Sequence, residues 1–155
     1  MMHTSLVPAV PGELRQAFAT ARERAQYASC ERRRSKLVLC VDDDMNIRDI
    51  VRHSLGEAGY PVLVCRDGLT SLSLLARFEP CLILLDVEMP ELNGFELLKE
   101  IRERFQTLRA KVIVLTGRQG LEDVRAAQNL GADDYLIKPF TRGNLVRRLD
   151  RWCGV

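Results

Sequence analysis

The sequence predicts an α/β protein built on a doubly wound, five-stranded parallel sheet. Residues 81–85 are consecutive apolar residues without polar alternation, which is typical of a short strand buried on both faces by helices. Along residues 36–155, strand-like apolar runs alternate with helical segments. This alternation favours parallel strands joined by right-handed crossover helices.

Each expected strand is a short apolar run, and each is followed by an expected helix. The strands are expected at residues 37–41, 61–64, 82–85, 111–115 and 134–137. The helices are expected from Ile47 to Gly56 or Gly59 and at residues 69–78, 95–105, 121–130 and 141–152, with Leu72, Leu75 and Ala76 facing inward in the second helix. Pro90, Asn93 and Gly94 are expected to turn the chain between the third strand and its helix.

Residues 1–35 are expected to form an extension that precedes a single folded domain at residues 36–155. Residues 1–12 contain two prolines and a glycine and have no hydrophobic period, which predicts disorder. Residues 13–34 have a helical stripe that is mostly alanine, which predicts a weakly buried helix. The three arginines at residues 32–34 are expected to be its solvated basic end.

Composition excludes several classes of protein. No apolar run approaches the ~18 residues needed to span a bilayer, and the N-terminus lacks the apolar core of a signal peptide. Five cysteines without C-x-x-C spacing indicate reduced thiols in a cytoplasmic protein, with no disulfide framework and no zinc site. A net charge of +2 is too small to indicate direct nucleic-acid binding.

Polar side chains follow four of the expected strands. Asp42 and Asp43 follow the first strand, Asp86 the third, Thr116 the fourth and Lys138 the fifth. The carboxyl ends of parallel strands meet at one edge of a sheet, so we expect these groups to lie close together. Clustered carboxylates require a cation, and Mg²⁺ prefers such oxygen ligands. A carboxylate can also attack phosphorus, while a metal, a lysine and a hydroxyl neutralise the phosphoryl oxygens.

At these positions the chain resembles the receiver domain of bacterial two-component response regulators. The matching motifs are V-D-D at residues 41–43, L-D-V-E-M-P at 85–90 followed by N-G at 93–94, L-T-G at 115–117, and G-A-D-D-Y-L-I-K-P-F at 131–140. They occur in the family's order and span about residues 36–152. The resemblance implies the flavodoxin/CheY-like (βα)5 fold with strand order 2-1-3-4-5.

The resemblance also implies roles for the acids. Asp86 matches the phosphoacceptor. Asp43, Asp86 and the backbone carbonyl of Glu88 match direct ligands of Mg²⁺, for which Mn²⁺ can substitute. Asp42 matches the acid that holds metal-bound water. Asp44 has no such role in the family and is expected to be a helix N-cap.

Three further residues match parts of the family's switch. Thr116 and Lys138 match the residues that bind phosphoryl oxygens. The bond between Lys138 and Pro139 matches one that is usually cis in the family, although few X-Pro bonds are cis. Tyr135 matches the aromatic residue that moves inward on activation. Without that role, Tyr135 is a strand tyrosine half-packed at the sheet edge.

Two finer expectations also rest on the resemblance. Glu88 and Arg118 stand where side chains tune the loss of the phosphoryl group, and their heads are expected to meet over Asp86. Without that role, they are two solvated charges that face each other. Residues 132–135 and Arg148 resemble parts of the surface, formed by the last two helices and the strand between them, through which transcription-factor receivers pair. Asn144 replaces an acid there, so we expect at most a weak homodimer.

We therefore expect a signalling switch that catalyses only its own phosphorylation and dephosphorylation. A histidine kinase or phosphotransfer protein would supply the phosphoryl group to Asp86, and the altered surface would bind a downstream protein target.

Two alternatives stay open. An aspartyl phosphatase of the haloacid dehalogenase type would use the D-x-D pattern in residues 42–44, but it would leave the Lys-Pro motif unexplained and would lack a cap domain. A phosphorylation-independent pseudo-receiver used for docking would not require the complete set of acids, threonine and lysine.

Overall fold

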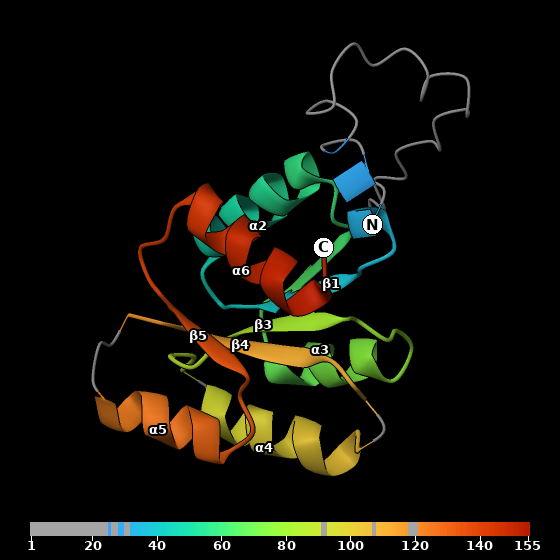
Figure 1. The fold of residues 1–155 in the computed structure, drawn as a ribbon. Coiled ribbons are helices and arrows are strands. Elements are labelled where there is room, and N and C mark those ends of the chain that lie inside the picture. Colours follow the sequence, from blue (N-terminus) through green and yellow to red (C-terminus); the bar gives the residue numbers. More distant parts are fainter. Residues whose placement is uncertain (1–24, 26–27, 30–31, 91–92, 107, 118–120) are drawn as a thin grey trace.

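The computed structural model describes residues 25, 28–29, 32–90, 93–106, 108–117 and 121–155. Within them lies one parallel sheet with the order β2-β1-β3-β4-β5, as the resemblance implied (Figure 1). Its strands are β1 (Val38–Val41), β2 (Val62–Cys65), β3 (Leu82–Asp86), β4 (Lys111–Thr116) and β5 (Asp134–Ile137).

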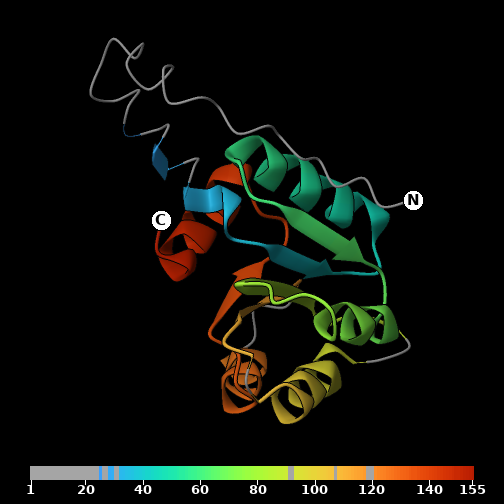
Figure 2. The ribbon, with the colours of Figure 1, turned by 90° about the vertical axis from the view of Figure 1, so that its right-hand side faces the viewer.

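Helices cover both faces of this sheet, as expected for parallel strands (Figures 1 and 2). The helices α2 (Met45–Ala58) and α6 (Arg142–Cys153) lie on one face. The other face carries α3 (Gly68–Leu75), α4 (Gly94–Arg104) and α5 (Leu121–Asn129). Among the helices in the described residues, none is both long and apolar enough to cross a membrane.

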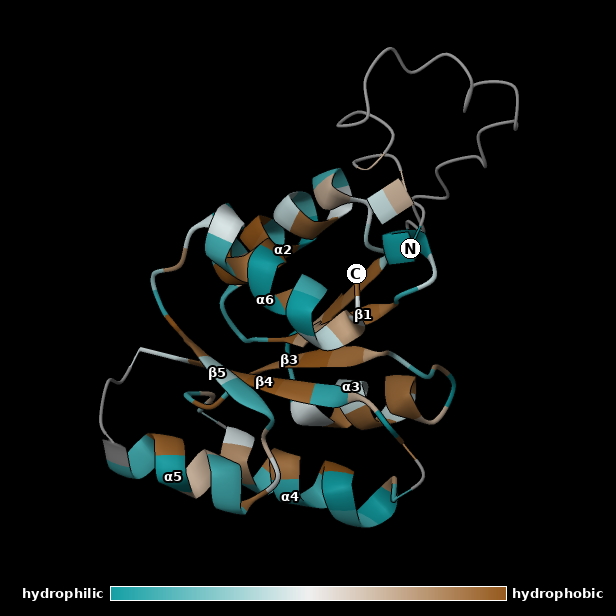
Figure 3. Cartoon of the chain, in the orientation of Figure 1, coloured by the Kyte–Doolittle hydropathy of each residue, from teal (hydrophilic) through white to brown (hydrophobic). Residues whose placement is uncertain are grey.

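The uninterrupted apolar runs of the central strands are explained by these two layers. Alternate residues of β3 contribute to different cores: Ile83 and Leu85 pack on the side of α3 and α4, whereas Leu82 and Leu84 pack on the side of α2 and α6. All four side chains are fully buried. Figure 3 shows the resulting pattern, with hydrophobic strands in the middle and helices that are hydrophilic on their outer sides.

Capping side chains define the helix ends close to the expected positions. Asp44 is the N-cap of α2, as predicted, and its side chain accepts a hydrogen bond from the backbone N–H of Asn46 at 2.8 Å. Gly59, with a φ of 95°, ends α2 in the left-handed conformation that glycine adopts without strain. The inward position predicted for Ala76 is wrong, because α3 ends at Leu75 and Ala76 is exposed.

The basic segment at residues 32–34 is helical, but it is not simply solvated. Arg33 donates to both carboxylate oxygens of Asp150 in α6, at 2.9 and 2.6 Å, and to the backbone carbonyl of Ala58 at 3.3 Å. The hydroxyl of Tyr60 donates to the same carboxylate at 2.6 Å. This bidentate contact joins the residues before β1 to the α2–α6 layer. Most of the helix expected at residues 13–34 lies outside the described residues.

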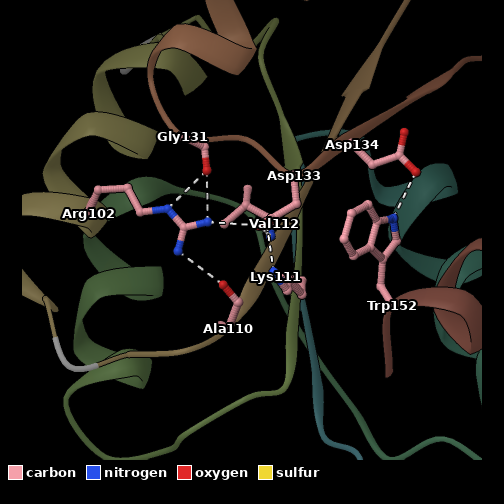
Figure 4. A network of polar contacts seen from close by, with 8 residues as sticks. All are labelled: Arg102, Ala110, Lys111, Val112, Gly131, Asp133, Asp134 and Trp152. Carbon is pink, nitrogen blue, oxygen red and sulfur yellow. Dashed lines mark hydrogen bonds and ion pairs between the residues drawn. The ribbon is translucent and has the colours of Figure 1, made fainter. Parts of the chain in front are cut away.

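A second polar network joins α4, β4 and the segment before β5 (Figure 4). The carboxylate of Asp133 accepts hydrogen bonds from Lys111 Nζ, Arg102 Nη2 and the backbone N–H of Val112, at distances of 2.9 to 3.0 Å. Arg102 also donates to the backbone carbonyl of Gly131. Because one acid serves three donors from two elements, its loss leaves several groups without an acceptor.

We expect Asp133→Ala to lower the free energy of unfolding by about 2 kcal/mol, because a backbone N–H and two cations lose their shared acceptor. Urea unfolding monitored by circular dichroism measures the change. Asp49→Ala is the control, since Asp49 is 54% exposed on α2 and pairs with Arg52. We expect this control to change stability by less than about 0.5 kcal/mol. Equal losses in the two variants would contradict a special role for Asp133.

Candidate functional site

The predicted polar residues do meet at one edge of the sheet. Asp42 directly follows β1, Asp86 is the last residue of β3 and Thr116 is the last residue of β4. Val41 is paired in register with Leu85, so the acids that follow these two residues lie on neighbouring strands. Lys138 directly follows β5 and donates its backbone N–H to the carbonyl of Thr116 at 2.8 Å. The topology therefore brings together side chains that are up to 96 positions apart.

Asp42, Asp43 and Asp86 form an acidic cluster. Each offers one carboxylate oxygen, and these oxygens all lie within 4.8 Å of one another. Asp42 and Asp86 are buried, with exposed fractions of 0% and 2%, whereas Asp43 is exposed. Burying ionised carboxylates this close together is costly unless a cation compensates for the repulsion.

Lys138 supplies part of that compensation. Its Nζ lies 2.7 Å from Oδ2 of Asp42 and 3.3 Å from Oδ1 of Asp86. Burial by itself would lower the pKa of Lys138, but the hydrogen bond and charge of Asp42, together with the charge of Asp86, outweigh it and raise that pKa. The ammonium therefore remains protonated between the two acids at neutral pH.

The environment of Asp86 favours its neutral form more than water does. Burial is the main cause that raises the pKa of Asp86, and the charge of Asp42 adds to it. The backbone N–H of Glu88, which donates to Asp86 Oδ1 at 3.0 Å, and the ammonium of Lys138 act in the opposite direction. An additional cation beside Asp86 would favour the carboxylate form further.

The donor set fits a divalent cation with oxygen ligands. Three carboxylates converge, two of them buried, and one ammonium cannot neutralise all three. Mg²⁺ and Mn²⁺ prefer carboxylate, carbonyl and water ligands, and Mg²⁺ typically takes only a few of them from the protein.

A family model described as the response regulator receiver domain matches residues 38–150. This chain belongs to the response regulator receiver family. The match covers the whole sheet, the helices α2 to α5 and most of α6, so it includes the strand ends that carry the acidic cluster.

Related proteins agree with this assignment. The response regulator MprA of Mycobacterium leprae is 39% identical over 112 residues, which are 72% of this chain and 48% of MprA. The receiver therefore spans about half the length of this relative. The chemotaxis protein CheY4 of Vibrio cholerae is 34% identical, with a TM-score of 0.72 over 75% of this chain and 97% of CheY4.

A third relative contains a metal. The receiver domain of the sensor histidine kinase PA1611 from Pseudomonas aeruginosa is 32% identical, with a TM-score of 0.70 over 77% of this chain and 98% of that domain. It is described with a magnesium ion coordinated in its active-site cleft.

The positions of some of the other predicted site residues agree with the resemblance, and one of these residues lies outside the described part of the chain. Thr116 is 3% exposed at the end of β4, and the bond between Lys138 and Pro139 is cis, as the resemblance implied. Tyr135 is half-buried on the edge strand β5, with its ring 5.9 Å from the guanidinium of Arg148. Arg118 lies outside the described residues, so its pairing with Glu88 stays a prediction.

Two supporting residues were missed by sequence reasoning. Arg48 Nη1 donates to the backbone carbonyls of Asp42 and Asp43, at 2.7 and 2.9 Å, and thereby holds the acidic loop. Gly94 permits a close approach, because a Cβ there would lie 2.2 Å from the carbonyl oxygen of Asp86. The signal for Arg48 is a cation about one helical turn beyond the acids. The Asn-Gly pair at residues 93–94 predicted a turn and matched a family motif, but it did not indicate the close approach to the backbone of Asp86.

We expect Lys138→Ala to lower the free energy of unfolding by about 2–4 kcal/mol without divalent cations, because it leaves the fully buried Asp42 without its ammonium. Combining it with Asp42→Asn should recover most of that loss, since the uncompensated charge is then absent. Denaturant unfolding in chelator measures both variants. Lys99→Ala is the matched control, because that ammonium is 63% exposed and should matter little. A double variant no more stable than Lys138→Ala would contradict the proposed pairing.

Proposed function

We propose that this receiver is a phosphorylation-dependent switch in which Asp86 accepts a phosphoryl group from the phosphohistidine of a histidine kinase or phosphotransfer protein. The observation that carries the proposal is a buried carboxylate at a strand end, 3.3 Å from a lysine ammonium and clustered with two further acids. Such an arrangement suits a nucleophile whose product is a more highly charged anion.

The chemistry follows from the positions of these groups. An oxygen of Asp86 forms a bond to phosphorus, and the bond from phosphorus to the donor's imidazole nitrogen breaks, with its electron pair returning to the imidazole. Lys138, protonated because of its raised pKa, stabilises charge on the phosphoryl oxygens. The hydroxyl of Thr116 binds another of these oxygens.

Asp43, Asp86 and the backbone carbonyl of Glu88 would hold Mg²⁺, with Mn²⁺ as a substitute, and Asp42 would hold its bound water. The bound cation supplies further neutralisation of the transferred phosphoryl group. The convergence of Asp42, Asp43 and Asp86 supports this assignment.

The negative charge of a phosphoryl group on Asp86 would then change the contacts that Lys138 makes with Asp42 and Asp86. The ammonium of Lys138 contacts both Asp42 and Asp86, and a phosphoryl group on Asp86 would compete for it. Lys138 and Thr116 are also joined through their backbones, so a shift of either side chain is transmitted to β4 and β5. The surface of α5, β5 with Tyr135, and α6 would change its affinity for a downstream protein target.

Charges on this surface already have partners within the chain, which supports at most a weak homodimer. Asp133 contacts Lys111 and Arg102, and Asp134 accepts hydrogen bonds from Arg148 and from Trp152 Nε1. An intermolecular ion pair would have to replace these contacts. The mild net charge likewise supports protein partners rather than direct binding of nucleic acid.

The chain would act as an enzyme only on itself, within the cytoplasm, and Glu88 and Arg118 would set how long the phosphoryl group persists. Arg118 could turn from Glu88 to the new anion and obstruct an attacking water. Turnover of p-nitrophenyl phosphate would instead favour the haloacid dehalogenase alternative.

We expect acetyl phosphate with Mg²⁺ to add one phosphoryl group to the protein, and Asp86→Asn to abolish this labelling, because an amide is a far weaker nucleophile. Intact-mass spectrometry measures the product. Asp44→Asn is the matched control: it removes the same charge two residues from Asp42, and asparagine caps a helix as well as aspartate does. We expect Asp44→Asn to be labelled like the wild-type protein. Full labelling of Asp86→Asn would contradict the assignment of Asp86 as the phosphoacceptor.

We expect Mg²⁺ to raise the melting temperature of the wild-type protein and not that of Asp43→Ala, which loses a ligand. Without metal, Asp43→Ala should melt slightly higher than wild type, because it removes one of three mutually repelling carboxylates. Thermal melts with Mg²⁺ and with chelator measure both effects. A metal-free Asp43→Ala protein that melts below wild type would be inconsistent with repulsion in the cluster.

A further inference from the structure

Two thiols meet at the opposite edge of the sheet from the acidic site. Cys81 directly precedes β3, whose other end is Asp86, and Cys153 is the last residue of α6. Their sulfur atoms are 3.1 Å apart, although the residues are separated by 72 positions. None of the cysteines in the described residues is in a disulfide, and the other two, Cys40 and Cys65, are buried separately in β1 and β2.

We propose that Cys81 and Cys153 form a reversible disulfide, so that the receiver carries a redox modification site independent of Asp86. The present distance between the sulfur atoms exceeds a disulfide bond of ~2.05 Å by about 1 Å. Rotation of the two side chains can bring the sulfur atoms closer by this amount. The folded protein is therefore close to the geometry of the disulfide.

The backbone around both thiols is held in place. The N–H of Cys81 donates to the carbonyl of Leu37 at 2.8 Å, and its carbonyl accepts from the N–H of Lys111 at 3.0 Å. Cys81 is therefore anchored to the chain segments on both sides. After Cys153, Gly154 caps α6 with a φ of 70° and donates its backbone N–H to the backbone carbonyl of Asp150. The short distance between the two thiols is therefore fixed by backbone hydrogen bonds on both sides of the contact.

The two thiols have different roles because their surroundings differ. Cys81 is partly exposed, and its hydrogen bond with Cys153 and the positive charge of Lys36 lower its pKa. Cys153 is 7% exposed, and the same hydrogen bond together with burial raises its pKa. Because Cys81 is the more accessible of the two, it is the thiol that reacts first with an external oxidant, and Cys153 is the thiol that resolves the product.

The oxidant is a small-molecule disulfide. The thiolate of Cys81 attacks one of its sulfur atoms, forms a mixed disulfide and releases one thiolate. Cys153 then loses its proton and attacks the sulfur of Cys81, which expels the second thiolate. The protein loses two electrons and two protons, and the small disulfide is reduced to two thiols.

The crosslink would attach the end of α6 to the start of β3. Helix α6 also supplies Arg148 and Trp152, which hold Asp134 of β5 (Figure 4 shows Trp152 with Asp134). Oxidation would therefore restrict a helix that is part of the surface, formed by α5, β5 and α6, proposed to change its affinity for a target. In a reducing compartment the pair stays as thiols, which makes it a sensor of oxidation and not a structural disulfide.

The experiment uses the full chain, first reduced and then equilibrated with oxidised and reduced glutathione. Non-reducing peptide mapping should find a peptide that joins Cys81 to Cys153, and excess reduced glutathione should reverse it. The melting temperature of the oxidised protein should rise by roughly 10 °C, because the crosslink restricts the unfolded chain. A different pairing, an intermolecular link, or no link in excess oxidant would overturn the proposal.

Single variants separate the roles of the two thiols. Cys153→Ser should leave Cys81 as a stable glutathione adduct, whereas Cys81→Ser should leave the buried Cys153 unmodified. Cys65→Ser is the matched control: it removes a buried thiol in β2 and should form the same link as wild type. An adduct on Cys153 in the Cys81→Ser protein would refute the order of reaction. Because the link is read directly in wild type, a variant that does not fold leaves the test intact.

Discussion

The acidic edge of the sheet depends on one lysine ammonium shared by two buried carboxylates. Lys138 contacts Asp42 at 2.7 Å and Asp86 at 3.3 Å, and the exposed Asp43 completes a cluster with more negative than positive charge. Lys138 compensates part of the repulsion between these acids, but one positive charge does not balance three carboxylates. In the function we propose, a phosphoryl group and a divalent cation enter a site whose clustered carboxylates favour additional positive charge.

The parallel sheet makes this interaction available. Its strands end at a common edge, so Asp42, Asp86, Thr116 and Lys138 are placed by backbone hydrogen bonds and not by flexible loops. Side chains around the site support it further, since Arg48 holds the carbonyls of the acidic loop. The opposite edge is held by other contacts, namely the Asp133 network and the thiol pair of Cys81 and Cys153.

Sequence reasoning reached the features that depend on local pattern. Uninterrupted apolar runs identified the strands, the residues after them identified the site, and Asp44 was recognised as a cap because capping is local. Sequence reasoning could not find contacts between residues that are far apart in the sequence and belong to no recognisable motif. Arg33 was interpreted as solvated because its partner Asp150 is 117 positions away, and five scattered cysteines gave no sign that two sulfur atoms meet. Ala76 was misplaced because α3 ends one residue before it.

The central claim is that Asp86, Thr116 and Lys138 respond as one unit to a phosphoryl group. Beryllofluoride, a stable mimic of a phosphoryl group on a carboxylate, tests it most directly when amide resonances are followed by heteronuclear NMR with Mg²⁺. The account predicts that Thr116, Lys138 and Tyr135 shift together in the wild-type protein and do not shift in Asp86→Asn. Unchanged resonances in wild type, or the same shifts in the variant, would contradict it.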